Sequence, residues 1–346
     1  MGSQMSRRGA LATPLGERNS PKPAKSWLWA ELPAPRARTL YESSRLPPPE
    51  HQKPKGAHPR FARIEAADRR FMRIRLGYDI QFLVPVPAPI VAMLNVHPSR
   101  AGDLLEPDVL RIEPEVDQEQ YVDGFGNLCT RFSAPAGLIR LWNSTLIEDS
   151  GEVDPHDYSA REIPVADLPP DALVFLLSSR YCEVDLLSNT AAQLFGNIPP
   201  GWQRVQAICD WVHQNVTFGY EFASATKTAL DVYRDRLGVC RDFQHLAITF
   251  CRSLNIPARY ATGYLGDICV PVAGPMDFSA WFEVYLAGRW WAFDARNNVP
   301  RIGRVLMATG RDATDVAITT SFGDARLVHF EITTDEVIAS QASAEV

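Results

Sequence analysis

The stretch Gly238-Val239-Cys240-Arg241-Asp242-Phe243-Gln244-His245-Leu246 decides the fold. It predicts a tight turn that delivers Cys240 to the first turn of a helix, because the apolar residues that follow recur on one helical face. Those apolar residues are Phe243, Leu246, Ala247, Phe250, Cys251 and Leu254. The positive end of a helix dipole favours a thiolate, and Arg241 adds a nearby cation, so we expect Cys240 to be a nucleophile. The alternative is a cysteine that only packs, since free cysteine is among the most buried residue types.

Three strands are predicted after this helix. The segment 256–265 is a strand candidate, and the runs 277–286 and 289–294 alternate around a short turn that contains Gly288. Two alternating runs joined in this way predict a β-hairpin. Pairing them places residues near 279 opposite residues near 294 or 295.

Taken in order, these blocks resemble the transglutaminase-like superfamily, the papain-like thiol enzymes of bacteria. The matching blocks are Gly238-Val-Cys-Arg-Asp-Phe-x-His-Leu, Ile256-Pro-Ala-Arg-Tyr-x-x-Gly-Tyr, Asp277-Phe-x-Ala-Trp-Phe-Glu and Gly288-Arg-Trp-Trp-Ala-Phe-Asp-Ala-Arg-Asn. The resemblance continues through 300–306 and 310–317. It implies a papain-like fold in which helices pack on an antiparallel sheet.

The resemblance also implies a set of site residues. The family uses a cysteine, a histidine and an aspartate, and these positions correspond to Cys240, Ser279 and Asp294. Ser279 therefore occupies the histidine position. A serine hydroxyl cannot take a proton from a thiol near neutral pH, so the usual general base is missing. Asp294, which would orient the imidazole, is left to bond Ser279, a water molecule or Arg296.

The remaining histidines and motifs offer no replacement base and no cofactor site. His245 lies five positions after Cys240, about 140° around the helix, so we expect it to pack elsewhere. We expect His213 to be solvated, and we assign His329 a site role only as a minor alternative. No two histidines have ligand spacing and no nucleotide-binding glycine motif is present, so the sequence predicts no metal and no cofactor.

Composition indicates a soluble globular chain. The 346 residues are 46% hydrophobic and 22% charged, with a net charge of −6. Residues 1–71 carry 14 Lys and Arg against 6 Asp and Glu, so the rest of the chain is strongly acidic. We therefore expect no nucleic-acid partner, and no apolar run is long enough to predict a membrane span. Six scattered cysteines suggest a reducing compartment, hence the cytoplasm, and the family resemblance implies a bacterial source.

Three regions are expected. Residues 1–71 form a basic, Pro-rich arm predicted to be disordered. Residues 72–165 alternate with period two and predict a small antiparallel β domain, whereas 166–340 form the transglutaminase-like domain, so the fold class is α+β. Further strands are expected over 90–96, 109–112, 127–133, 138–147 and 326–331, and helices over 171–181, 186–195, 201–215 and 228–235.

These observations suggest two functions, with a purely structural role as a third alternative. The first is a cysteine enzyme, a protease, amidase or acyltransferase, that acts on a peptide or protein substrate through a Cys240 acyl-thioester. The second is a catalytically degenerate member, a pseudoenzyme that binds peptides or proteins. The choice between hydrolysis and transfer and the oligomeric state stay open.

Overall fold

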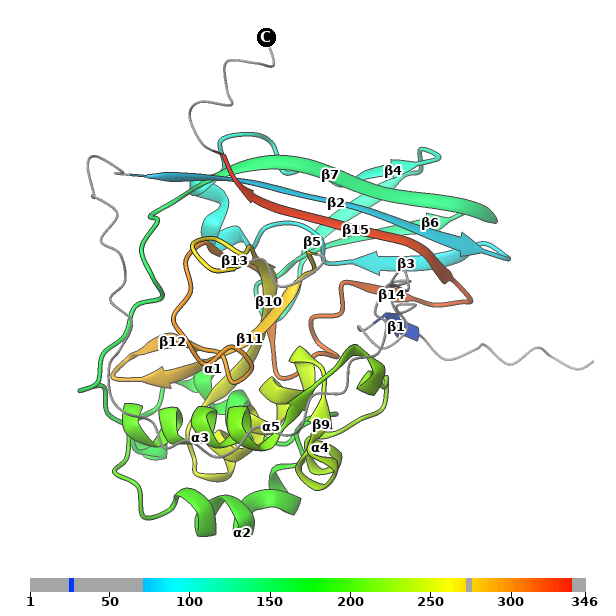
Figure 1. Ribbon diagram of the computed structural model, residues 1–346. Coiled ribbons are helices and arrows are strands. Elements are labelled where there is room, and N and C mark those ends of the chain that lie inside the picture. The colour runs from blue at the N-terminus through cyan, green and yellow to red at the C-terminus, as the bar shows by residue number, and fades with distance from the viewer. Residues whose placement is uncertain (1–24, 28–70, 272–275, 338–346) are drawn as a thin grey trace, which may run out of the picture.

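The computed structural model describes residues 25–27, 71–271 and 276–337 (Figure 1). Most of the arm 1–71, including its expected disorder, lies outside the described residues. Only Lys25–Trp27 of that arm is described, as strand β1, which pairs with β14. The expected α+β class is confirmed, since helices gather on one side of the molecule and antiparallel sheets fill the other.

Two sheets form a β-sandwich in the upper half of Figure 1. One sheet has the order β15-β2-β7-β4, and the other has the order β1-β14-β3-β6-β5. The strands are β2 (Met72–Val84), β3 (Ala88–Ala92), β4 (Arg111–Glu113), β5 (Gln118–Val122), β6 (Leu128–Ala134), β7 (Gly137–Asp149), β14 (Thr319–Ser321) and β15 (Arg326–Glu336).

The longest ladder of the sandwich shows why the sequence alternates. Strand β2 pairs with β7 from Met72↔Asp149 to Val84↔Gly137. Alternate side chains of β2, such as Ile74 and Ile80, are buried between the two sheets, because successive side chains of a strand point to opposite faces. The final strand β15 pairs with the other side of β2, so the C-terminal end of the described chain completes a sheet begun by residue 72.

A third sheet, with the order β12-β11-β10-β13, lies between the sandwich and the helices (Figure 1). Its strands are β10 (Ala258–Leu265), β11 (Ser279–Leu286), β12 (Arg289–Phe293) and β13 (Arg304–Gly310). The predicted hairpin is confirmed as β11 and β12. The two turn residues, Ala287 and Gly288, have φ values of 50° and 86°. Positive φ at both positions is typical of the two-residue hairpin turn whose twist matches that of the strands.

The helices cover the face of the third sheet that is turned away from the sandwich. They are α1 (Pro170–Leu173), α2 (Val184–Phe195), α3 (Trp202–Asn215), α4 (Ala229–Asp235) and α5 (Cys240–Ser253). Helix α5 is central, and its Phe243 and Ala247 share a core with Ala280 and Phe282 of β11. The short parallel pair β8 (Thr217–Phe218) and β9 (Leu237–Gly238) leads the chain into α5.

One helix expectation needs correction, and one helix is more deeply buried than the others. The helix expected over 171–181 is shorter, because the chain forms only α1 and one 3-10 turn, Val174–Leu176, before it leaves helical geometry. In helix α5, every residue from Cys240 to Arg252 is buried, including the residues outside its apolar face. Its polar residues are covered because each finds an internal partner, as buried polar groups require.

No helix among the described residues is both long enough and apolar enough to cross a membrane.

Candidate functional site

The start of α5 is held by a short local network. The Asp242 carboxylate reaches back to accept a hydrogen bond from the Val239 N–H at 2.9 Å, which satisfies a donor that the helix itself leaves free. This approach needs a glycine at 238, because a Cβ there would lie 2.7 Å from the Cβ of Asp242. The turn predicted from the sequence therefore has a steric cause, and it fixes Cys240 as the first helical residue.

Cys240 is buried, with a relative exposure of 6%. Burial raises the pKa of its thiol to about 12, although Arg296 and the backbone N–H of Arg241 oppose that increase. Burial disfavours the charged form, and here it outweighs the stabilisation offered by the helix start. Burial therefore acts against the thiolate that the helix start was expected to favour.

The cation that acts on the thiol is Arg296, and not Arg241 as expected. The Arg241 side chain turns away and bonds Asp242 Oδ1 through Nε at 3.1 Å and Nη2 at 2.9 Å. The positive charge that lowers the pKa of Cys240 belongs to Arg296, which follows strand β12. The Arg296 guanidinium lies over the Phe218 ring at 4.0 Å. An arginine that is distant in sequence thus takes the electrostatic role that Arg241 was expected to have.

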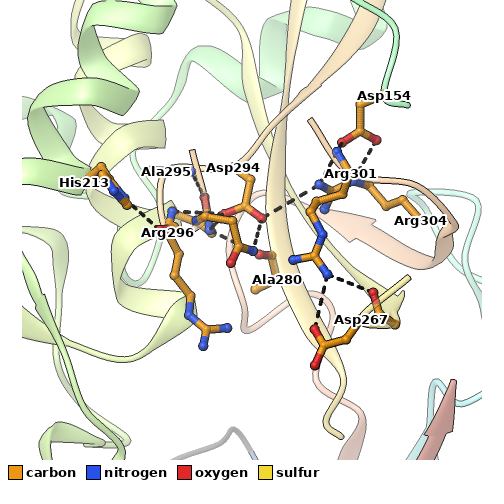
Figure 2. Close-up of polar contacts among 12 residues, drawn as sticks. Asp154, His213, Asp267, Ala280, Asp294, Ala295, Arg296, Arg301 and Arg304 are labelled. Carbon is orange, nitrogen blue, oxygen red and sulfur yellow. Dashed lines mark hydrogen bonds and ion pairs between the residues drawn. The ribbon is translucent and has the colours of Figure 1, made fainter. Parts of the chain in front are cut away.

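Asp294 is the most completely bonded side chain of the site (Figure 2). Its Oδ1 accepts hydrogen bonds from Gln244 Nε2 at 3.1 Å and from the backbone N–H of Arg296 and Asn297, both at 3.0 Å. Its Oδ2 accepts one from Asn297 Nδ2 at 2.8 Å. From the sequence, we expect Asp294 to bond Ser279, a water molecule or Arg296. Arg296 does bond it, through its backbone N–H. The carboxylate therefore anchors the end of β12 to α5.

Gln244 is the helix side of this anchor. It lies one turn after Cys240 and is completely buried. Besides its bond to Asp294, its Nε2 donates to Ala280 O at 3.2 Å, and its Oε1 accepts from the Ala295 N–H at 3.1 Å. One amide thus connects the cysteine helix to β11 and to the end of β12.

Arg304 supports Asp294 from the opposite side. Its Nη2 lies 3.8 Å from Asp294 Oδ2, and its guanidinium is fixed by two bonds of 3.0 Å to Asp154, as Figure 2 shows. The same guanidinium lies 4.7 Å from the centre of the Trp281 ring. His213 lies at the edge of this network. Its side chain is exposed, and its Nδ1 lies 2.8 Å from Arg296 O.

Ser279 lies at the first position of β11, where it pairs with Gly263 of β10. A Cβ at position 263 would lie 2.0 Å from Val305 O, so only glycine allows β10 and β13 to approach at this level. The β11–β12 ladder ends at Phe282↔Phe293, which places Asp294 one step beyond it. Continued past the ladder, the same register sets residue 280 opposite 295, which is close to the expected pairing of residues near 279 with residues near 294 or 295. No hydrogen bond joins Ser279 to Cys240 or Asp294 within the described residues.

The other side chains singled out in the sequence have packing roles. His245 stacks on Tyr181 at 5.0 Å between ring centroids, and its Nε2 accepts from the Ala313 N–H at 3.1 Å. His329 lies on β15, where it faces Glu331 at 3.5 Å. The hairpin tryptophans are packed against other rings or guanidinium groups, and Glu283 pairs with Arg259.

Sequence analysis did not single out Gln244 or Arg304 as site residues. One signal was present, because Gln244 is four residues after Cys240 and therefore shares its helical face. The partners of Arg304 lie far away in the chain, so no spacing pointed to them. Within the described ranges, no group of three or more His, Cys, Asp or Glu side chains is arranged to hold a metal ion.

Comparison with known proteins agrees with this geometry. Residues 188–295, which include Cys240, Ser279 and Asp294, match the family described as the transglutaminase-like superfamily. A crystal structure of a "Putative Cysteine Protease" from Cytophaga hutchinsonii is 32% identical, with a TM-score of 0.69, and the match covers 78% of this chain and 92% of that one. The chain belongs to the transglutaminase-like superfamily.

Two further relatives are more distant. The uncharacterized protein ML0607 of Mycobacterium leprae is 26% identical over 215 residues, which cover 59% of this chain and 75% of that protein. The periplasmic domain of TgpA from Pseudomonas aeruginosa, in a crystal structure with bound ethylmercury, is 14% identical with a TM-score of 0.35. That match covers 66% of this chain and 90% of the TgpA domain.

Proposed function

We propose that this protein is a cysteine enzyme that acts on peptide or amide bonds through an acyl-thioester on Cys240, with Ser279 in place of the usual histidine. The observation that carries the proposal is the position of the Cys240 thiol at the first residue of α5, beside the Arg296 charge. Membership of the superfamily and likeness to a solved structure named as a "Putative Cysteine Protease" support the same class.

The first chemical step is attack by sulfur. The Cys240 sulfur forms a bond to the substrate carbonyl carbon, and the oxygen becomes an oxyanion. The first N–H groups of a helix have no partner within the helix, so the Cys240 N–H can donate to that oxyanion. The carbon–nitrogen bond then breaks, and the leaving amine takes a proton. Water releases the acyl group as an acid, or an amine releases it as a new amide.

The proposed partner is a peptide or protein, because the family acts on amide bonds and no described cluster of side chains indicates a cofactor. A bacterial cytoplasmic location is part of the proposal, and the six free cysteines support it. Fractionation of the source cells, with antibody detection of the full chain, tests this location. Recovery mainly outside the cytoplasmic fraction would contradict it.

Acyl-enzyme trapping tests the chemistry. The full chain is incubated with peptide thioesters, esters and fluorogenic amides, then digested and analysed by mass spectrometry. We expect transient acylation of Cys240, release of acid or transfer to an added amine, and loss of both in Cys240→Ala. The matched control is Cys269→Ala, which removes an exposed cysteine and should leave turnover unchanged. Acylation confined to Cys269 would contradict the proposal.

A second function is favoured by one observation, the burial that raises the pKa of Cys240 to about 12. A thiol that stays neutral, in a chain with serine at the family's histidine position, suits a pseudoenzyme that binds peptides without turnover. Peptide binding followed by fluorescence anisotropy separates the two functions. The binding module predicts equal affinity in the wild-type chain and in Cys240→Ala, with no acylated Cys240 in either experiment.

A further inference from the structure

One guanidinium of the candidate site has no anionic partner among the described residues. Arg296 makes its hydrogen bonds through the backbone, where its N–H donates to Asp294 Oδ1 and its O lies 2.8 Å from His213 Nδ1. Its side chain extends away from these contacts, and Figure 2 draws no polar contact to the guanidinium. The other arginines drawn there are each paired with a carboxylate; they are Arg301 and Arg304.

The contacts of Phe218 place this guanidinium at the turn that delivers Cys240. The guanidinium lies over the Phe218 ring at 4.0 Å, and Phe218 pairs with Gly238 in the β8–β9 ladder. Cys240 follows Gly238 by two residues, and its helix approaches the same ring through Phe243, at 6.4 Å between centroids. The pKa of Cys240 agrees with this placement, since after burial the charge beyond β12 is the largest influence on it.

No neighbouring acid cancels the charge of Arg296. Asp242 is bonded by Arg241, and the oxygens of Asp294 accept hydrogen bonds from amide and backbone N–H groups. No ion pair joins the guanidinium to Asp277, and burial raises the pKa of Asp277 well above its usual value, which favours the neutral form. The cation is therefore available to an anion from outside the described chain.

The guanidinium is also held in a form that suits an anion. Its main chain is fixed by Asp294 and His213, and the Phe218 ring covers one face of the planar group. The five N–H donors of an arginine lie in the plane of the guanidinium, so contact through a face leaves them available. This planar fork matches the two oxygens of a carboxylate. A half-buried position weakens the competition from water.

We propose that Arg296 binds a carboxylate of the substrate peptide, close to the amide bond that Cys240 attacks, and so selects acidic substrates. This inference rests on the proposed function of Cys240. A peptide carries a carboxylate at its C-terminus or on an Asp or Glu side chain. The chain beyond residue 71 is strongly acidic, so an acidic peptide gains no general attraction and needs a dedicated cation.

The deciding experiment labels the full chain with two reagents that differ in one carboxylate. N-bromoacetyl-glycine and N-bromoacetyl-glycinamide alkylate a thiol in the same step, in which sulfur bonds the methylene carbon and bromide leaves. Peptide mapping by mass spectrometry at pH 9 gives the ratio of the two rates at Cys240 and at the exposed Cys269. Both reagents meet the same thiolate, so the pKa of each thiol cancels in its ratio.

We expect the acid-to-amide ratio at Cys240 to exceed that at Cys269 by about tenfold or more, as charge-assisted hydrogen bonds should give. Arg296→Met should lower the ratio to the Cys269 value. Arg296→Lys keeps the charge without the planar fork and should retain only part of the preference. Arg326→Met removes a charge at an exposed position of β15 and should leave the ratio unchanged. A wild-type ratio in Arg296→Met or Arg296→Lys would overturn the proposal.

A second pair of reagents separates the two sources of the carboxylate. N-bromoacetyl-glutamic acid α-amide and N-bromoacetyl-glutamine amide differ only in the side-chain carboxylate. A preference confined to the glycine pair assigns Arg296 to the C-terminal carboxylate of a peptide, and one confined to the glutamate pair assigns it to an acidic side chain. No preference in either pair would overturn the inference. The labelling needs no turnover, so its result and that of acyl-enzyme trapping are independent.

Discussion

Gln244 donates a hydrogen bond to Asp294 Oδ1 over 3.1 Å, so the carboxylate in the family's aspartate position is held by the helix that carries Cys240. The same amide bonds the backbone at Ala280 and Ala295. An aspartate that would orient an imidazole in the family is here part of a closed network. The network keeps the site assembled although the imidazole is missing.

Replacing Gln244 should therefore cost more stability than an ordinary polar substitution. Gln244→Met keeps the length of the side chain but removes the amide that bonds Ala280 O and the Ala295 N–H, and it takes away one of the four hydrogen bonds to Asp294. We expect the free energy of unfolding to fall by about 2–4 kcal/mol, measured by urea denaturation. Gln120→Met, on exposed strand β5, is the matched control and should change it by less than about 0.5 kcal/mol. Equal effects would contradict the anchoring role.

Cys240 should react slowly with alkylating reagents at neutral pH. Burial raises its pKa to about 12, so the thiolate is scarce, and Cys269 serves as an exposed internal reference. We expect iodoacetamide to label Cys240 roughly ten times more slowly than Cys269 at pH 8, and faster as the pH rises. Peptide mapping by mass spectrometry measures both rates. Equal labelling at pH 7 would mean that the thiol is ionised.

The charge of Arg296 should be visible in the same measurement. Arg296 lowers the pKa of Cys240, so Arg296→Met should raise that pKa further and slow the labelling at each pH below it. Arg326→Met, at an exposed position of β15, removes the same charge far from the thiol and should leave the rate unchanged. If both variants label at the wild-type rate, Arg296 is not the cation that acts on the thiol.

A histidine placed at position 279 should raise the rate of hydrolysis. Ser279→His restores an imidazole at the family's position. We expect at least about a tenfold gain over the wild-type protein, with a new pH limb near 6.5. Ser279→Ala is the control and should gain nothing. Equal rates in the two variants would show that position 279 does not reach the reacting atoms.

Acid should destabilise the protein through His245. Burial lowers the pKa of His245 to about 3, below its value of about 6.5 in the unfolded chain, so between these values the unfolded state binds the extra proton. The stabilising contribution is complete above pH 6.5 and is lost as the pH falls toward 3. The slope approaches about 1.4 kcal/mol per pH unit from this single group.

Denaturation midpoints from pH 4 to 7 measure that slope. His245→Gln removes the titrating ring and should flatten the dependence, even though it also lowers stability at neutral pH. His156→Gln changes an exposed histidine in the same way and should leave the slope as it is. A His245→Gln slope equal to that of the wild-type protein would contradict the assignment.

The sequence was sufficient where periodicity and turn chemistry act locally. Alternation predicted β2, and the Ala287-Gly288 turn predicted the β11–β12 hairpin, because both signals come from neighbouring residues. Strand β5 was missed since all five of its residues are exposed, so it shows no alternation of apolar and polar side chains.

The site was less predictable because its contacts are distant in the chain. Whether Cys240 is ionised depends on burial by residues from other elements, which a helix-start argument does not include. Likewise, the partner of Arg241 is its neighbour Asp242, whereas the cation near the thiol comes from position 296. Position along a helix indicated which residue was the candidate nucleophile, but tertiary packing sets its charge.

The pairing of β15 with β2 has a consequence for synthesis. Glu336 lies opposite Ile74, so strand β2 stays without one neighbour during synthesis until β15, more than 240 residues later, has been translated. The exposed edge of β2 is then open to other nascent chains for most of the elongation time. That edge needs shielding during translation, and chaperone capture of the unfinished chain is one means.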